Sequence, residues 1–172
     1  MSRRRPAVLP LLLLVAACVG GCVKSLEQVE REVRETFPGV PQITTRELAD
    51  WLADRRRKPP LLLDVRQPEE YRVSHLRSAM WVDPEGGIPP QIAHLDRATP
   101  IVAYCSVGFR SSFLVSQLQA AGFTNVYNLE GSIFAWANEG RPVFRDGREV
   151  SEVHPYSLSW GRLLRKDRRA SY

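Results

Sequence analysis

Short apolar runs alternate with helical signals between residues 43 and 145. The runs are too short for helices and are typical of buried strands; they lie at 61–65, 79–82, 101–104 and 126–129. Between them, apolar residues at helical spacing, or a proline followed by acids, indicate helices at 45–53, 67–71, 88–95, 111–121 and 133–138. The first helix is expected to be capped by Thr45. Strands that alternate with helices predict an α/β domain, with a mainly parallel central sheet and helices on both faces.

The first 22 residues have the order of a secretory signal peptide. Arginines at 3–5 precede an apolar stretch at 7–17, and small residues follow around two cysteines. The apolar stretch is shorter than the ~20 residues of a spanning helix, and an uncleaved anchor is the alternative. The segment Val15-Ala16-Ala17-Cys18 resembles a bacterial lipobox, whose cysteine is lipidated and begins the mature protein. The segment that ends at Cys22 fits almost as well, so we expect a lipid on Cys18, with Cys22 as the alternative.

These features divide the chain into four parts: a signal peptide with its lipobox-like segment at 1–22, a spacer or short helix at 23–42, the folded domain at 43–145 and a C-terminal extension at 146–172. A lipidated N-terminus predicts a protein of the bacterial cell envelope that is anchored to a membrane and faces the periplasm. The net charge of +5 comes from the basic ends of the chain, and the body between them is slightly acidic. No nucleic-acid partner is therefore expected.

Cys105 stands where a predicted strand gives way to a predicted helix. In this setting, free backbone N–H groups and the positive end of a helix dipole favour a thiolate, which is the reactive form of cysteine. Arg110 lies on the same loop. The alternative is a small buried hydrophobic residue, the common fate of a free cysteine. If Cys18 or Cys22 is lipidated, Cys105 is the only cysteine of the folded body, and an unpaired thiol in an exported protein favours a chemical role.

Four segments between about 43 and 145 resemble, in the right order, the motifs of the rhodanese family. Residues 63–71 resemble the "DVR-x-x-x-E-[YF]" segment, and residues 74–79 resemble "G-H-I-x-G-A" with serine in place of both glycines. Residues 105–111 match the active loop of single-domain members, "C-x-x-G-x-R-S". Residues 128–136 resemble "L-x-G-G-x-x-A-W", again with a serine for one glycine. The replaced glycines put local backbone shape in doubt rather than catalysis.

The resemblance implies sulfur transfer without a metal or other cofactor. Cys105 would attack the outer sulfur of a small donor such as thiosulfate, become a persulfide, and pass that sulfur to cyanide or a thiol. Arg110 would hold the anionic donor or the persulfide, and Gly108 would permit a tight turn. The substrate-binding loop, whose backbone amides would form a nest for the terminal sulfur, would consist of Ser106, Val107, Gly108, Phe109, Arg110 and Ser111.

Two further residues are expected to support this loop. Asp64 and Arg66 lie at the end of a predicted strand, on the side of the active loop. The family places the aspartate near the loop, where it would orient it. For Arg66 we favour a structural ion pair, for example with Glu70.

Two other functions compete with sulfur transfer. A phosphatase or arsenate reductase of the same fold needs five residues between cysteine and arginine, whereas four intervene here, and the smaller loop suits a single sulfur atom better. A membrane-tethered, non-enzymatic module that binds a partner or senses sulfur is the second alternative, although inactive relatives typically lose the cysteine.

The segment Val153-His154-Pro155-Tyr156, together with Trp160-Gly161, resembles a C-terminal extension of some bacterial members of the family. His154 is expected to pack or to hydrogen-bond rather than to catalyse.

Overall fold

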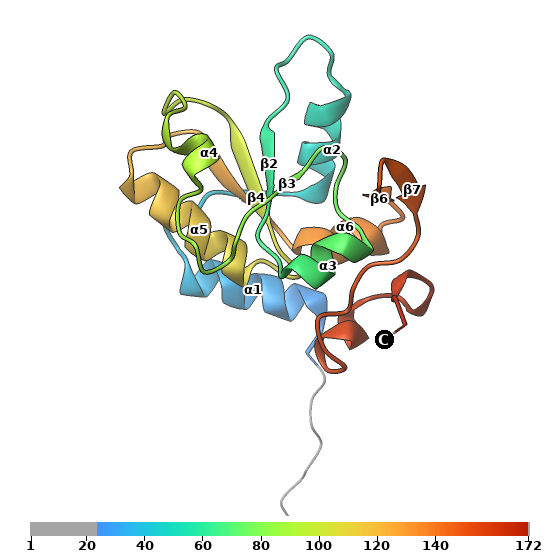
Figure 1. Cartoon of the computed structure of the whole chain (residues 1–172). Coiled ribbons are helices and arrows are strands. Elements are labelled where there is room, and N and C mark those ends of the chain that lie inside the picture. Colours follow the sequence, from blue (N-terminus) through green and yellow to red (C-terminus); the bar gives the residue numbers. More distant parts are fainter. Residues whose placement is uncertain (1–23, 172) are drawn as a thin grey trace, which may run out of the picture.

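The computed structural model describes residues 24–171, so the expected signal peptide and both candidate lipidation cysteines lie outside the described residues. A five-stranded parallel sheet forms the centre of the protein, in the order β1-β5-β4-β2-β3 (Figure 1). The strands are β1 (Gln42–Ile43), β2 (Leu61–Asp64), β3 (Met80–Trp81), β4 (Ile101–Tyr104) and β5 (Val126–Leu129). All carboxyl ends of these strands point to one edge of the sheet, where α/β proteins form their sites.

Helices cover both faces of the sheet (Figure 1). The side chains of β4 alternate between the two sides: Val102 and Tyr104 join one core cluster, and Ile101 and Ala103 join the other. Three helices pack into the first cluster: α1 (Leu26–Thr36), α2 (Thr45–Ala53) and α6 (Ser132–Asn138). Two pack into the second cluster: α4 (Pro90–Ala93) and α5 (Phe109–Ala120). The remaining helix, α3 (Pro68–Val73), follows β2. The α/β fold with a mainly parallel sheet is thus confirmed.

The expected elements are present, with small shifts at their ends. Helix α5 begins at Phe109, two residues earlier than expected, so it starts immediately after Gly108. The cap of α2 is Thr44 rather than Thr45: the Thr44 hydroxyl accepts a hydrogen bond from the Glu47 N–H at 3.2 Å, and the Glu47 carboxylate accepts one from the Thr44 N–H. The Thr45 hydroxyl instead donates to the carboxylate of Glu139, the residue that follows α6 (Ser132–Asn138).

The interval expected to be a spacer or short helix contains α1, and this helix packs against the domain. Its apolar residues Val29 and Val33 are buried in the core, since they lie on one face of the helix. A side chain at Gly108 would contact Val33, and Arg34 forms an ion pair with Glu130. Residues 26–36 are therefore part of the folded unit rather than a free connection to it.

The C-terminal extension also packs onto the domain. An antiparallel hairpin of β6 (Val143–Arg145) and β7 (Arg148–Val150), which the sequence interpretation did not include, leads into it, and two short 3-10 helices follow at η1 (Trp160–Leu163) and η2 (Lys166–Arg168). Val153 and Leu164 are buried in the first core cluster. Among residues 24–171, no helix has the length and apolar character that are needed to cross a membrane.

Candidate active site

Cys105 follows β4 directly, and its side chain is held in the loop that leads to α5. The residue is 2% exposed. The backbone N–H of Gly108 donates a hydrogen bond to Cys105 Sγ, with 3.1 Å between nitrogen and sulfur. Among the described residues this is the only cysteine, and it is free. The sulfur thus lies at the first turn of α5, where backbone N–H groups have no partner within the helix.

Gly108 is required by the shape of this loop. Its φ of +120° is one that residues with a side chain rarely adopt. A Cβ at this position would also lie 3.3 Å from Asn128 Nδ2 and 3.4 Å from Val33 Cγ1. Glycine at position 108 therefore allows the loop to bring its backbone N–H to Cys105 Sγ while it packs against Val33 of α1.

The loop is hydrogen-bonded from its other side by the start of α6. The hydroxyl of Ser132 accepts a hydrogen bond from the Cys105 N–H at 3.1 Å. The backbone N–H groups of Ile133 and Phe134 donate to the carbonyl oxygens of Cys105 and Ser106, each at 3.2 Å. These contacts fix the backbone of Cys105 and Ser106 against the first turn of α6, on the side of the loop opposite to α5.

Arg110 does not point freely into the site but is bound to Glu70 of α3. Its two terminal nitrogens contact the two carboxylate oxygens at 2.7 and 3.0 Å. The Ser106 hydroxyl joins this pair, since it donates to Glu70 at 2.7 Å and accepts from Arg110 at 2.9 Å. Burial raises the pKa of Glu70, but the hydrogen bonds and charge of Arg110 outweigh it and hold that pKa below its usual value. Arg110 and Glu70 therefore form an ion pair in which both groups are charged.

The environment of Cys105 favours its thiolate. Burial by itself raises the pKa of the thiol, but the positive charge of Arg110 and hydrogen bonds from Ser111 and Gly108 lower it below its ordinary value. A thiolate stabilised in this way is a nucleophile at neutral pH.

The other loop residues form the support of the site. Val107 is buried in the first core cluster, and Phe109, the first residue of α5, packs at its border. The Ser111 hydroxyl donates to the Gly108 carbonyl at 3.3 Å. The expected loop 106–111 thus forms one connected structure around the sulfur.

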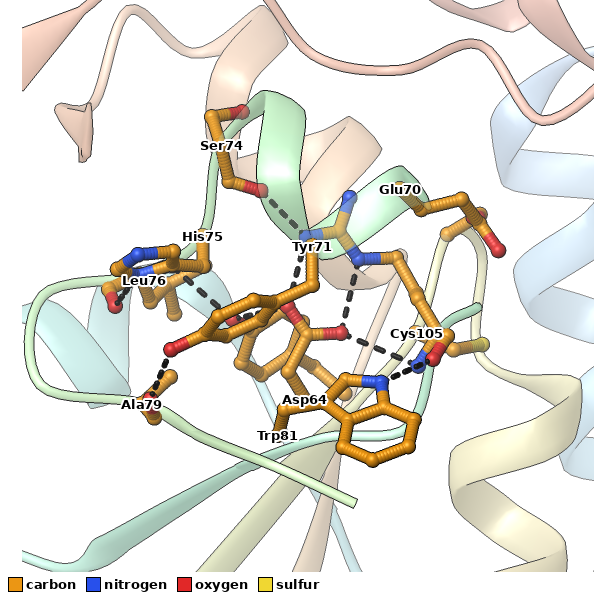
Figure 2. A network of polar contacts seen from close by, with 12 residues as sticks. Asp64, Glu70, Tyr71, Ser74, His75, Leu76, Ala79, Trp81 and Cys105 are labelled. Atoms are coloured by element: carbon orange, nitrogen blue, oxygen red, sulfur yellow. Dashed lines mark hydrogen bonds and ion pairs between the residues drawn. The ribbon is translucent and has the colours of Figure 1, made fainter. Parts of the chain in front are cut away.

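Asp64 and Arg66 are the centre of a buried network of polar contacts. Figure 2 shows Asp64 in this network, with Cys105 nearby. Two nitrogens of Arg66 donate to the two oxygens of Asp64, at 2.9 and 2.6 Å, and both side chains are fully buried. The Tyr104 hydroxyl donates to Asp64 at 2.7 Å and accepts from the Leu76 N–H at 3.0 Å. Burial and the charge of Asp64 raise the pKa of Tyr104 well above its usual value, so its hydroxyl stays a donor.

The position of Arg66 corrects one expectation. The ion pair between Arg66 and Glu70 does not form, because Arg66 lies in the interior with Asp64 whereas Glu70 faces Arg110. Asp64 supports the active loop through Tyr104, the residue that precedes Cys105, rather than by touching the sulfur.

Serines at two of the motif's glycine positions adopt the backbone shape of glycine. Ser78 has a φ of 60° and Ser132 a φ of 52°, which residues other than glycine seldom adopt. In Ser132 the side chain contributes directly, through its hydrogen bond with the Cys105 N–H. Ser74, at the third such position, is extended and needs no special conformation.

Three residues of the site were not identified from the sequence: Glu70, Ser132 and Tyr156. The sequence indicates Glu70 only as part of a helix start and as a partner for Arg66, and neither pattern indicates its contact with Arg110. Tyr156 comes from the C-terminal extension, and its ring faces the Arg110 guanidinium, with 4.9 Å between the guanidinium carbon and the ring centroid. No local signal joins it to a loop more than forty residues away.

The sequence pattern of the rhodanese-like domain matches residues 48–139 of the chain. The chain belongs to the rhodanese-like domain family. A rhodanese-like domain protein from Staphylococcus aureus has a similar structure: the TM-score is 0.54 and the identity 29%, over 62% of this chain and 99% of that one. A rhodanese-like domain from Anabaena sp. gives a TM-score of 0.55 at 28% identity, over 62% of this chain and 80% of that one.

Among named relatives, a sulfurtransferase of Allochromatium vinosum is 33% identical over 104 residues, which are 60% of this chain and 94% of that protein. The probable adenylyltransferase/sulfurtransferase MoeZ of Mycobacterium tuberculosis is 36% identical over 102 residues, 58% of this chain. That match spans only 25% of MoeZ. The likeness to MoeZ therefore concerns the rhodanese-like domain and not the rest of that protein.

Proposed function

We propose that the protein is a sulfurtransferase that carries sulfur as a persulfide on Cys105, from a donor such as thiosulfate to a thiophilic acceptor. The observation that supports this most directly is the contact between the Gly108 N–H and Cys105 Sγ at 3.1 Å, at the first turn of α5. A loop of this kind stabilises an anion on sulfur by backbone N–H groups. Relatives that are named as sulfurtransferases agree with this chemistry.

The proposed reaction has two balanced displacements. The Cys105 thiolate attacks the outer sulfur of thiosulfate; a bond forms between Sγ and that sulfur while the S–S bond of the donor breaks, and sulfite leaves with its electron pair. An acceptor, cyanide or a thiolate, then attacks the terminal sulfur and releases the Cys105 thiolate. No external oxidant or reductant takes part, and the lowered pKa of Cys105 removes the need for a general base.

Mass spectrometry of the intact protein tests the proposal. After incubation with thiosulfate and removal of the excess, the protein is expected to gain the mass of one sulfur atom, and cyanide should remove it with release of thiocyanate. A protein that never gains sulfur from any donor would favour the non-enzymatic module instead.

The reactivity of Cys105 should depend on pH through a lowered pKa. Because the charge of Arg110 and the hydrogen bonds of Ser111 and Gly108 stabilise the thiolate, its alkylation rate should rise with pH through a midpoint below the free-thiol value of about 8.5. Arg110→Ala should move that midpoint upward. Arg56→Ala serves as the matched control, because the Arg56 side chain is 94% exposed in the loop before β2. A wild-type midpoint at or above the free value would contradict this electrostatic account.

We further propose that the protein is anchored to a membrane of the bacterial cell envelope by a lipid on its N-terminal cysteine. The support is the lipobox-like segment before Cys18. A fatty-acyl label should be incorporated by the wild-type protein and lost in Cys18→Ser. Loss of the label in Cys22→Ser alone would move the site to Cys22, and an unlabelled wild-type protein would overturn the anchor.

A further inference from the structure

The C-terminal extension brings an aromatic ring to the active site. Tyr156 faces the guanidinium of Arg110 at 4.9 Å, within the range of a cation–π contact. Tyr156 is itself about half exposed, and the Arg110 side chain is 25% exposed. Tyr156 therefore lies between Arg110 and solvent. It belongs to the C-terminal extension, outside the residues 48–139 that match the family.

The extension holds Tyr156 in a defined and unusual conformation. Its φ of 64° lies in the left-handed region, which is strained for a tyrosine and persists only where surrounding contacts impose it. The Tyr156 N–H donates to His154 Nδ1 at 3.0 Å, and the Ser157 N–H donates to the Pro155 carbonyl at 2.7 Å. Val153, just before this turn, is fully buried and bonds to Arg168 and Ala170. After the turn, the Gly161 N–H donates to the Ser157 carbonyl at 2.8 Å, so the turn is held on both sides and the position of the ring is fixed by the fold.

Arg110 offers little free charge to a substrate. The two nitrogens that would grip an oxyanion are already bonded to the carboxylate of Glu70, which is 1% exposed. Tyr156 then covers one approach to the guanidinium. A doubly charged anion that enters the site consequently meets an arginine that is paired with a carboxylate and partly covered by a ring, and it gains less there than from an unpaired, exposed arginine.

We propose that Tyr156 is a specificity-determining residue, whose ring screens Arg110 so that Cys105 favours sulfur donors with at most one negative charge, such as organic persulfides, over the thiosulfate dianion. This inference rests on the proposed sulfurtransferase function and narrows its donor class. It assigns the C-terminal extension a part in the active site.

The reaction with an organic persulfide is balanced in the same way as that with thiosulfate. The Cys105 thiolate attacks the outer sulfur of R–S–SH. The bond between Sγ and that sulfur forms as the S–S bond of the donor breaks. The thiolate of R leaves with the electron pair of that bond and takes up the proton of the outer sulfur. The products are the Cys105 persulfide anion and a free thiol, with no net oxidation.

Two variants separate the ring from the backbone. Tyr156→Gly removes the ring at a φ that glycine adopts without strain, so the turn should keep its shape. Tyr156→Asn removes it with a residue that also tolerates this region. Tyr156→Phe keeps the aromatic face. Leu158→Ala is the matched control, because Leu158 is 78% exposed two residues further along the same extension.

The first measurement compares alkylation of Cys105 by iodoacetate, an anion, with alkylation by neutral iodoacetamide. The ratio of the two rates reports how much positive charge an incoming anion meets, and it needs no sulfurtransferase activity. We expect this ratio to rise about threefold or more in Tyr156→Gly and Tyr156→Asn, a change of the size of an exposed cation–π contact. Tyr156→Phe and Leu158→Ala should keep the wild-type ratio.

The second measurement compares thiosulfate with methanethiosulfonate, a donor of similar size that carries one negative charge fewer. Removal of the ring should raise kcat/KM for thiosulfate relative to methanethiosulfonate by a similar factor, through a lower KM for thiosulfate. An unchanged alkylation ratio in both ring-less variants would overturn the role of Tyr156 even if the wild type transfers sulfur. If the ring-less variants shift the alkylation ratio but the wild type transfers no sulfur, the result would support the screening of Arg110 by Tyr156 and refute the proposed function.

Discussion

Replacement of Cys105 by serine is expected to abolish sulfur transfer and to leave the fold intact. The serine hydroxyl is a far weaker nucleophile and cannot form a persulfide. It can still accept the hydrogen bond that the Gly108 N–H gives to Cys105 Sγ, and it fits the same buried space. Thiocyanate release from thiosulfate and cyanide should fall to the level without enzyme, and the intact protein should no longer gain a sulfur atom. Unchanged thermal unfolding would show that the loss is chemical.

The same assay decides between sulfur transfer and the competing hydrolytic chemistry. Four residues separate Cys105 from Arg110, and the two nitrogens of Arg110 that would bind a phosphoryl group are engaged with Glu70. We therefore expect no release of phosphate from an aryl phosphate by the wild-type protein. Phosphate release that disappears in Cys105→Ser, without any sulfur transfer, would replace the proposed function by that of a phosphatase.

Local patterns in the sequence predict the central elements well. Strands β4 (Ile101–Tyr104) and β5 (Val126–Leu129) end where the apolar runs end, because each run is short and is bounded by polar or turn-forming residues. The position of Cys105 at a strand-to-helix junction follows from the same pattern. The β6–β7 hairpin could also have been predicted from the sequence. Asp146-Gly147 is a favoured two-residue hairpin turn, and both residues have positive φ.

The pairing of charged residues could not be predicted, because it depends on contacts between distant segments. Arg66 had acidic residues at 64 and 70 within reach along the chain, and only the fold shows that it bonds to Asp64 while Glu70 turns toward Arg110. Likewise, the polar composition of residues 23–42 suggested a spacer or short helix outside the domain, whereas the two buried valines of α1 pack this helix into the core. Tyr156 contacts Arg110 because the C-terminal extension folds back onto the domain, and no sequence motif predicts that contact.

Removal of the carboxylate of Asp64 is expected to cause the largest loss of stability among single substitutions at these sites. In Asp64→Ala the guanidinium of Arg66 stays fully buried without its counter-charge, and its Nη1 already has no hydrogen-bond partner. The Tyr104 hydroxyl loses its acceptor at the same time. Loss of one partner of a buried ion pair typically costs about 3–5 kcal/mol, because the remaining charge is not compensated. Urea unfolding should show this as a lower midpoint at an unchanged slope.

A second pair in the same chain isolates the effect of burial. Arg165 and Asp167 are also two residues apart and are joined by the same two-pronged contact, at 3.0 and 2.7 Å, but their side chains are 54% and 59% exposed. Water and salt screen such a pair, so Asp167→Ala should leave the urea midpoint nearly unchanged. Substitution of both partners by apolar residues, Asp64→Leu with Arg66→Met, should recover much of the loss of Asp64→Ala, since no charge then remains buried. Equal effects of Asp64→Ala and Asp167→Ala would mean that burial of the Asp64 pair does not determine its contribution. Because Tyr104 directly precedes Cys105 and donates its hydroxyl hydrogen bond to Asp64, the stability lost at Asp64 should be accompanied by slower alkylation of the Cys105 thiol.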